Sequence, residues 1–137
     1  MVEKMTINTH KGIDYNLCGK PVELKNRYAR VELTTTSVMT VDHYKLIHGG
    51  FVFGLADHAA MLAVNHPNVV LASASVKFLK PTQPDELLIA EANVVSIQEK
   101  KYQVDVTVKN NQHIIFEGQL TCFILKDHVL SSHKNNP

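Results

Sequence analysis

Hydrophobic and polar residues alternate with a period of two along several segments of the chain. The clearest alternation runs from Tyr28 to Thr36, where residues 28, 30, 32 and 34 form one face and residues 29, 31, 33 and 35 the other. Such alternation is typical of strands, whose successive side chains point to opposite faces of a sheet. Together with apolar runs bounded by turn residues, it predicts strands over residues 22–24, 28–36, 69–79, 86–97, 102–109 and 113–125.

One segment does not alternate. Between Gly49 and Asn65 nearly every residue is apolar and of a type that favours a helix, and Pro67 ends the run. A helix that is apolar on all sides is buried on all sides, so we expect the strands to surround it. The order of the elements predicts an α+β fold, with one long central helix wrapped by a curved antiparallel sheet of about five to six strands.

The boundaries of this single domain follow from the same pattern. We assign residues 22–126 to the domain, residues 1–21 to an irregular N-terminal segment and residues 127–137 to a polar, disordered C-terminal tail. A chain of 137 residues is long enough for one hydrophobic core.

Charge and cysteine content narrow the function classes. The chain has 14 Lys and Arg against 13 Asp and Glu, a balance that argues against nucleic-acid binding. Its 2 cysteines form no disulfide framework, and no spacing of Cys or His is typical of a metal site. No signal peptide is recognisable, and the most apolar segment is shorter than the ~20 residues of a membrane span. We therefore expect a cytoplasmic protein without metal, organic cofactor, nucleic-acid or membrane partner.

Asp57 is the only acidic residue in the predicted helix. Burying an unpaired carboxylate costs several kcal/mol, so this side chain is either paired, exposed at an interface, or functional. The structural alternative is a pair with His58 or with a donor from a strand.

His48, Gly49 and Gly50 form the start of the predicted helix. Two glycines allow the backbone N–H groups to approach a ligand closely, and the helix dipole favours negative charge there. Such donors can stabilise an oxyanion. A plain glycine-rich cap is the alternative interpretation.

The spacing of these two features constrains how they can cooperate. The nine steps from His48 to Asp57 rotate by about 900°, which leaves the two residues about 180° apart on the helix. One helix cannot direct both at one point, whereas two copies can. The sequence therefore indicates a site shared across a dimer.

These residues also carry a family resemblance. His48-Gly49-Gly50, followed by Leu55-Ala56-Asp57 and later by Phe78-Leu79-Lys80-Pro81, resembles the hotdog-fold thioesterases of the PaaI-like group. The resemblance covers most of the chain, from about Val22 to Leu125. It implies a hotdog fold, assembly into a dimer or a dimer of dimers, and two active sites at the dimer interface.

The resemblance further implies roles for individual residues. Asp57 would be the nucleophile or general base of an acyl-CoA thioesterase, the Gly49 or Gly50 N–H would polarise the thioester carbonyl, and His48 would orient the loop or contact that carbonyl. Many relatives have Asn where this chain has Asp42, and an ionised Asp can only accept hydrogen bonds.

Three further residues are candidates for substrate binding. Ser73 and Ser75 lie on the strand that relatives place near the site, on the face opposite Ala74, and could position water or the acyl group. Lys80 could meet the phosphates of coenzyme A, although a solvated lysine is the default.

Two other functions are compatible with the pattern. A non-catalytic acyl-CoA sensor could use the same fold, although such regulators usually carry a DNA-binding segment, for which the first 20 residues offer no room. A hotdog dehydratase is disfavoured, because its usual His and acid pattern does not surround Asp57.

Overall fold

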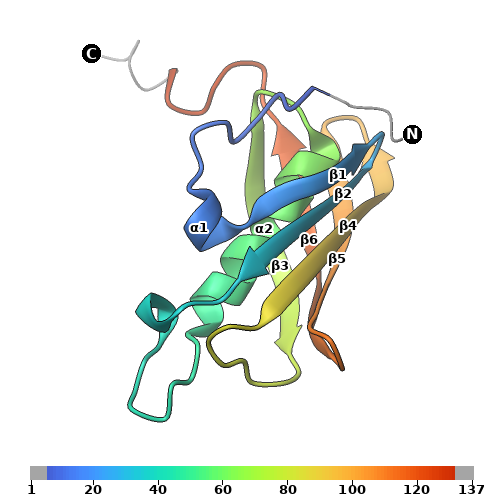
Figure 1. Cartoon of the computed structure of the whole chain (residues 1–137). Helices are drawn as coiled ribbons and strands as arrows, with labels where there is room; N and C mark the ends of the chain where they lie inside the picture. The colour runs from blue at the N-terminus through green and yellow to red at the C-terminus, as the bar shows by residue number, and fades with distance from the viewer. Residues whose placement is uncertain (1–5, 132–137) are drawn as a thin grey trace.

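The computed structural model describes residues 6–131, which form one sheet and one long helix (Figure 1). The elements are α1 (Tyr15–Cys18), β1 (Lys20–Lys25), β2 (Tyr28–Thr34), the 3-10 helix η1 (Ser37–Met39), α2 (Gly49–Val64), β3 (Val69–Phe78), β4 (Leu87–Gln98), β5 (Lys101–Lys109) and β6 (Ile114–Ile124). The helix and the six strands lie within a few residues of the positions that the hydrophobic pattern predicts.

The six strands form one antiparallel sheet in the order β1-β2-β4-β5-β6-β3, curved around α2 (Figure 1). The predicted α+β fold, with a long helix wrapped by a curved sheet, is therefore confirmed. β3 follows α2 directly in the chain but lies at the far edge, beside β6. Its other edge has no partner strand among the described residues.

Small side chains bring α2 close to the centre of the sheet. Ala56, Ala59 and Ala60 on the helix are fully buried, and so are Ala29 of β2 and Ala90 and Ala92 of β4. Alanine on both sides shortens the distance between helix axis and sheet. Larger side chains, among them Phe116 and Leu120 of β6, fill the remainder of the core.

Both ends of α2 are capped by side-chain or backbone hydrogen bonds. His48 is the N-cap, and its Nδ1 accepts from the Gly50 N–H at 2.7 Å. Asn65 is the C-cap in a left-handed conformation, with φ 54°, and its N–H donates to the Met61 carbonyl at 2.8 Å. These caps explain why the helix begins at Gly49 and ends at Val64.

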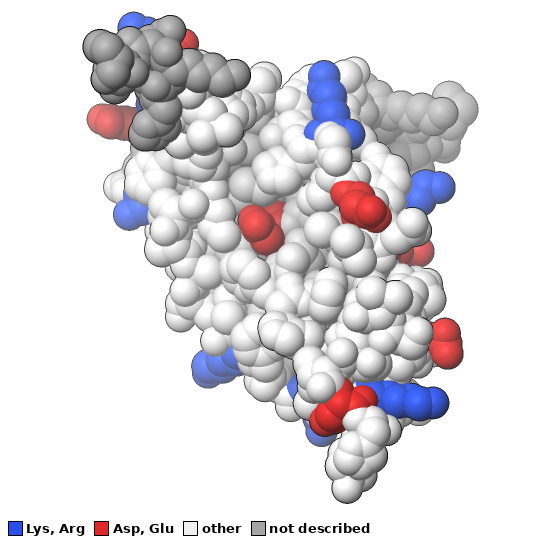
Figure 2. All heavy atoms as spheres, turned by 90° about the vertical axis from the view of Figure 1, so that its left-hand side faces the viewer, with Lys and Arg blue, Asp and Glu red and all other residues white. Residues whose placement is uncertain are grey.

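The expectation that α2 is buried on all sides is wrong within a single chain. Gly50, Phe53, Gly54 and Asp57 recur at helical spacing and remain exposed or half-buried. Their positions share one stripe of the helix, which the curved sheet does not reach because its edge strands do not meet. The side of the molecule on which α1 lies carries few charges at its centre (Figure 2). We call Gly50, Phe53, Gly54 and Asp57 the open stripe.

Two terminal predictions need correction. The N-terminal segment contains the short helix α1, capped by the Asp14 carboxylate, which accepts from the Asn16 and Leu17 N–H groups. Residues 127–131 of the predicted disordered tail form a turn, in which His128 Nδ1 accepts from the Leu130 N–H at 3.0 Å. Residues 132–137 of that tail lie outside the described residues.

Within residues 6–131, no helix is long and apolar enough to span a bilayer.

Candidate active site

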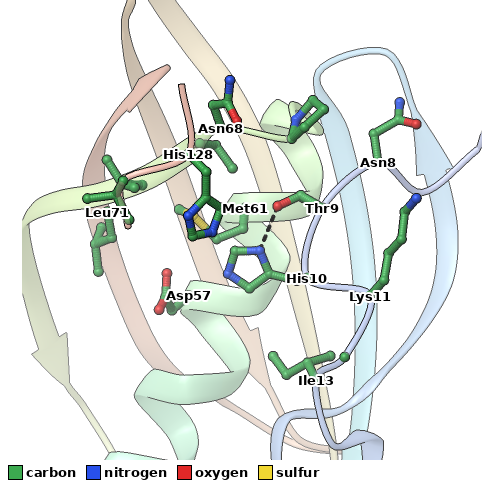
Figure 3. A pocket seen from close by; sticks show the side chains of 15 residues that line it. Asn8, Thr9, His10, Lys11, Ile13, Asp57, Met61, Asn68, Leu71 and His128 are labelled. Carbon is green, nitrogen blue, oxygen red and sulfur yellow. Dashed lines mark hydrogen bonds between the residues drawn. The ribbon is translucent and has the colours of Figure 1, made fainter. Parts of the chain in front are cut away.

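The side chain of Asp57 points from the middle of α2 into a cavity of about 810 Å³ (Figure 3). We call this the Asp57 cavity. It is lined by the N-terminal residues 8–13, by Met61 of α2, by residues 67–71 around the start of β3, and by His128 and Val129. The cavity therefore lies where the N-terminal segment, the open stripe and the edge strand meet.

The carboxyl group of Asp57 is buried without compensation. Its Oδ1 has no hydrogen-bond partner within residues 6–131, and no ion pair formed by these residues includes it. Desolvation raises the pKa of Asp57 from 3.8 to about 6. A carboxylate with this pKa is mostly ionised at pH 7 and is a stronger base than a solvated one, as general-base catalysis requires.

The structural alternative for Asp57 is not what the structure contains. His58 is only 1% exposed, and its Nδ1 donates to the Cys18 carbonyl at 3.0 Å instead of pairing with Asp57. The buried thiol of Cys122 lies near Asp57, and burial together with the Asp57 charge raises the pKa of Cys122 to about 12. Neither His58 nor Cys122 therefore compensates the charge of Asp57.

The start of α2 offers one free backbone donor. His48 Nδ1 takes the Gly50 N–H, whereas the Gly49 N–H has no acceptor within residues 6–131. Gly49 packs against the ring of Phe78. A Cβ added at Gly49 would lie only 3.2 Å from a carbon of that ring. A free N–H at the positive end of a 16-residue helix is suited to bind a negatively charged oxygen.

A second cavity, of about 270 Å³, lies beside this helix start, and we call it the Gly49 cavity. Gly49, Phe78 and Lys80 line it, together with a largely apolar group: Leu46, Ile47, Val52, Leu79, Pro81, Thr82 and Ile115. The structure therefore places Lys80 and Gly49, which are distant in the sequence, in the lining of one cavity.

The other predicted site residues lie elsewhere in the single chain. The Asp42 carboxylate accepts from the Leu46 N–H at 3.2 Å and so holds the exposed loop before α2. Ser73 and Ser75 pair with Thr121 and Gln119 of β6 and share their face of the sheet, opposite the face that α2 covers. Within one chain, neither serine reaches Asp57.

The Asp57 and Gly49 cavities share no lining residue, yet both border β3. Residues 69–71 at its start line the Asp57 cavity, and Phe78 at its end lines the Gly49 cavity. The cavities of Asp57 and Gly49 therefore border opposite ends of β3, whose outer edge has no partner strand within residues 6–131.

Among the residues of the Asp57 cavity that sequence reasoning missed are its two histidines, His10 and His128. Neither histidine has a spacing typical of a metal site, and no local sequence pattern links either of them to Asp57. Their proximity arises only from the path of the terminal segments. Residues 6–131 contain no group of three or more His, Cys, Asp or Glu side chains that could hold a metal ion.

A comparison with known protein families matches residues 44–116 to the thioesterase superfamily. The matched region contains α2, Asp57 and the start of β6. The chain therefore belongs to the thioesterase superfamily.

Individual relatives refine this placement. The chain is 28% identical to the acyl-coenzyme A thioesterase PaaI of Escherichia coli over 129 residues, which cover 87% of this chain and 91% of PaaI. The crystal structure of an uncharacterised protein from Pyrococcus horikoshii superposes with a TM-score of 0.91 at 46% identity, covering 92% of this chain and 97% of that one. The resemblance to PaaI-like thioesterases is thus confirmed.

A third relative has a different name. A methylthioribose-1-phosphate isomerase from Aquifex aeolicus is 47% identical over 123 residues, which cover 90% of this chain but only 27% of that protein. The chain thus spans about a quarter of the length of this relative.

Proposed function

We propose that this chain is an acyl-CoA thioesterase in which Asp57 is the general base and the Gly49 N–H stabilises the oxyanion. The observation that carries the proposal is the buried, unpartnered Asp57 carboxylate in a cavity of about 810 Å³, in a member of the thioesterase superfamily. The free Gly49 amide supplies the complementary group.

The chemistry needs these two groups and a water molecule. Asp57 accepts a proton from the water while the water oxygen attacks the carbonyl carbon of the thioester. Negative charge then develops on the carbonyl oxygen. A preorganised N–H directed at that oxygen stabilises the transition state more than the ground state. When the C–S bond breaks, the sulfur keeps the electron pair and takes the proton from Asp57, giving a carboxylic acid and a thiol.

One site needs two chains. If the free edge of β3 pairs antiparallel with β3 of a second copy, the start of one strand lies beside the end of the other. The Asp57 cavity of one chain then adjoins the Gly49 cavity of its partner, because the two cavities border opposite ends of β3. The free edge of β3 and the open stripe support such a dimer. Two such dimers could then assemble into a tetramer.

The remaining site residues are assigned to the substrate. Lys80, exposed beside the Gly49 cavity, would attract the phosphates of coenzyme A, and the apolar lining would receive the acyl chain. Ser73 and Ser75 would contribute only where the partner chain closes over them. The relative PaaI, named an acyl-CoA thioesterase, supports this substrate class, and the two free cysteines fit a cytoplasmic location.

Thiol release from a panel of acyl-CoA thioesters tests the function. We expect hydrolysis of at least one acyl-CoA without added metal or cofactor. Saturable binding of acyl-CoA without any turnover would contradict the proposal and would favour a sensor on the same fold.

The dimer can be tested at Ala74, in the middle of β3. Ala74 is exposed although its partner Leu120 is buried, as expected for a residue that a second copy covers. Ala74→Glu places two carboxylates near the two-fold axis, where like charges repel. We expect light scattering to shift from at least twice the chain mass of 15.3 kDa to the monomer mass, with loss of turnover.

The matched control is Val22→Glu on β1, the other edge strand. Val22 is 41% exposed and borders neither cavity, so this change should leave both mass and turnover unchanged. A wild-type protein that is monomeric and active, or an Ala74→Glu dimer with full activity, would contradict the shared site.

Asp42 gives a prediction of smaller effect. Asp42→Asn keeps an oxygen that can accept from the Leu46 N–H, so the loop before α2 should keep its conformation. It also removes a negative charge and adds a hydrogen-bond donor in the exposed loop that precedes α2. We expect an unchanged melting temperature and a kcat that is equal or higher, measured on one preparation. A lower melting temperature would instead assign Asp42 an essential structural role as a carboxylate.

A further inference from the structure

The N-terminal segment is fixed across the open side of α2 by hydrogen bonds at both ends. At one end, the Asn65 side chain accepts from the Asn8 N–H at 2.8 Å and donates to the Thr6 carbonyl at 2.9 Å. At the other end, the Cys18 carbonyl accepts from His58 at 3.0 Å. Both anchors belong to α2 or its C-cap, so the segment between them keeps a set position relative to Asp57.

His10 lies between these anchors and is held from several sides. Its backbone has a φ of 54°, a conformation uncommon for residues other than glycine, and its carbonyl accepts from the Ile13 N–H at 3.3 Å. Its ring stacks on His58 with 6.4 Å between centroids and 22° between planes. The ring of Tyr15 stacks on the same His58.

The imidazole of His10 also has a defined direction. Its Nδ1 lies 2.8 Å from the hydroxyl of Thr9, a residue only 6% exposed. Figure 3 shows the opposite side of the ring, with its second nitrogen, directed across the cavity toward Asp57. Burial lowers the pKa of His10, which favours the neutral ring. When Thr9 donates to Nδ1, the single ring proton lies on Nε2.

His128, the other histidine of the cavity, is held less firmly. It is exposed, and its Nδ1 accepts from the Leu130 N–H in a turn of the C-terminal segment. The ring of His10, by contrast, is half-buried, stacked and hydrogen-bonded. Of the two, His10 is the group with a preorganised donor.

We propose that His10 binds the attacking water, with its Nε2–H donating to the water oxygen while Asp57 accepts the proton of that water. This inference rests on the proposed thioesterase function. The Asp57 carboxylate and the ring of His10 both line the Asp57 cavity and face each other across it, which leaves space for a water molecule between them. The water proton goes to Asp57 and later to the leaving sulfur, while its oxygen becomes part of the carboxylic acid. His10 neither gains nor loses a proton.

Three variants separate this role from packing. His10→Phe keeps a ring that can stack on His58 but removes both nitrogens. Thr9→Val keeps the shape of the side chain but removes the hydroxyl that fixes the His10 ring. Tyr15→Phe is the matched control, because Tyr15 stacks on the same His58 but does not line the cavity.

The variants are compared by kcat, KM and melting temperature on the acyl-CoA that the wild type hydrolyses best. For His10→Phe we expect kcat to fall about 10- to 100-fold, the range for losing one hydrogen bond to a reacting group, with little change in KM. Thr9→Val should lower kcat by a smaller factor, and Tyr15→Phe should not change it.

Different results would contradict the proposed role of His10 and the proposed thioesterase function. If His10→Phe keeps the wild-type kcat while Asp57→Asn loses activity, the role of His10 is wrong and the thioesterase function stands. If His10→Phe unfolds, Thr9→Val decides, and an undiminished kcat in that variant overturns the proposal. A wild-type protein without thioesterase activity overturns both.

Discussion

Asp57→Asn is expected to lower the turnover of acyl-CoA by at least ~100-fold, the usual scale for losing a general base. Asparagine has nearly the same size as aspartate but cannot take a proton from water. The binding of acyl-CoA should survive, because the Gly49 amide and the lining of the Gly49 cavity are unchanged. Turnover is measured by thiol release, and binding by calorimetry with an unreactive thioether analogue.

The same substitution should change how stability depends on pH. Burial raises the pKa of Asp57 from 3.8 to about 6, so the folded protein binds this proton more tightly than the unfolded chain. Ionisation therefore opposes folding. The cost is absent below about pH 4, grows as the pH rises toward 6, and reaches at most about 3 kcal/mol above that. Asp57→Asn should then equal the wild type at low pH and exceed it at pH 7.

Denaturant unfolding at several pH values checks this sign. If Asp57 instead formed a stabilising ion pair, the Asn variant would be less stable at pH 7 and would lose little activity. An active but destabilised variant would contradict the assignment of Asp57 as the base.

Gly49→Pro is expected to lower kcat by about 100- to 1000-fold, the range found when one oxyanion donor is removed. Proline has no N–H, so this change deletes the one free amide at the helix start. The fold should tolerate it, because proline is favoured at the first position of a helix. The preceding His48, with φ −63° and ψ 130°, already has the extended conformation that a following proline requires.

Gly49→Ala is the matched control. It keeps the N–H and brings a Cβ to the same Phe78 ring, 3.2 Å away. We expect a kcat within a few-fold of the wild type and a small drop in melting temperature. If both variants lose activity equally, crowding against Phe78 explains the loss, and the Gly49 N–H is not the oxyanion donor.

The fold could be predicted from the sequence because its signals are local. Alternation marks strands such as β5, and an apolar run ended by Pro67 marks α2. The position of β3 at the sheet edge could not be predicted, because it depends on pairing with β6, about 50 residues later in the chain. The half-exposed face of α2 follows from that position, which is why a helix apolar on all sides is not buried on all sides here.

The site could be predicted where a residue type is unusual for its place in the sequence. Asp57 stands out as the one acid in an apolar helix, and Gly49 as a glycine at the start of that helix. Which of the two glycines keeps a free N–H could not be predicted, because it depends on the hydrogen bond from the Gly50 N–H to His48 Nδ1. His10 carries no sequence signal, because its place opposite Asp57 depends on the bonds between Asn65 and residues 6–8.

The most direct test of hydrolysis at a shared site is the activity of mixed dimers of Asp57→Asn and Gly49→Pro chains. Each variant alone should be nearly inactive. If each site takes Asp57 from one chain and Gly49 from the other, a mixed dimer contains one doubly defective site and one intact site. Random mixing after unfolding and refolding should therefore restore roughly a quarter of the wild-type kcat per chain. No recovery in the mixture, with mixed dimers demonstrated by mass, would contradict the shared site.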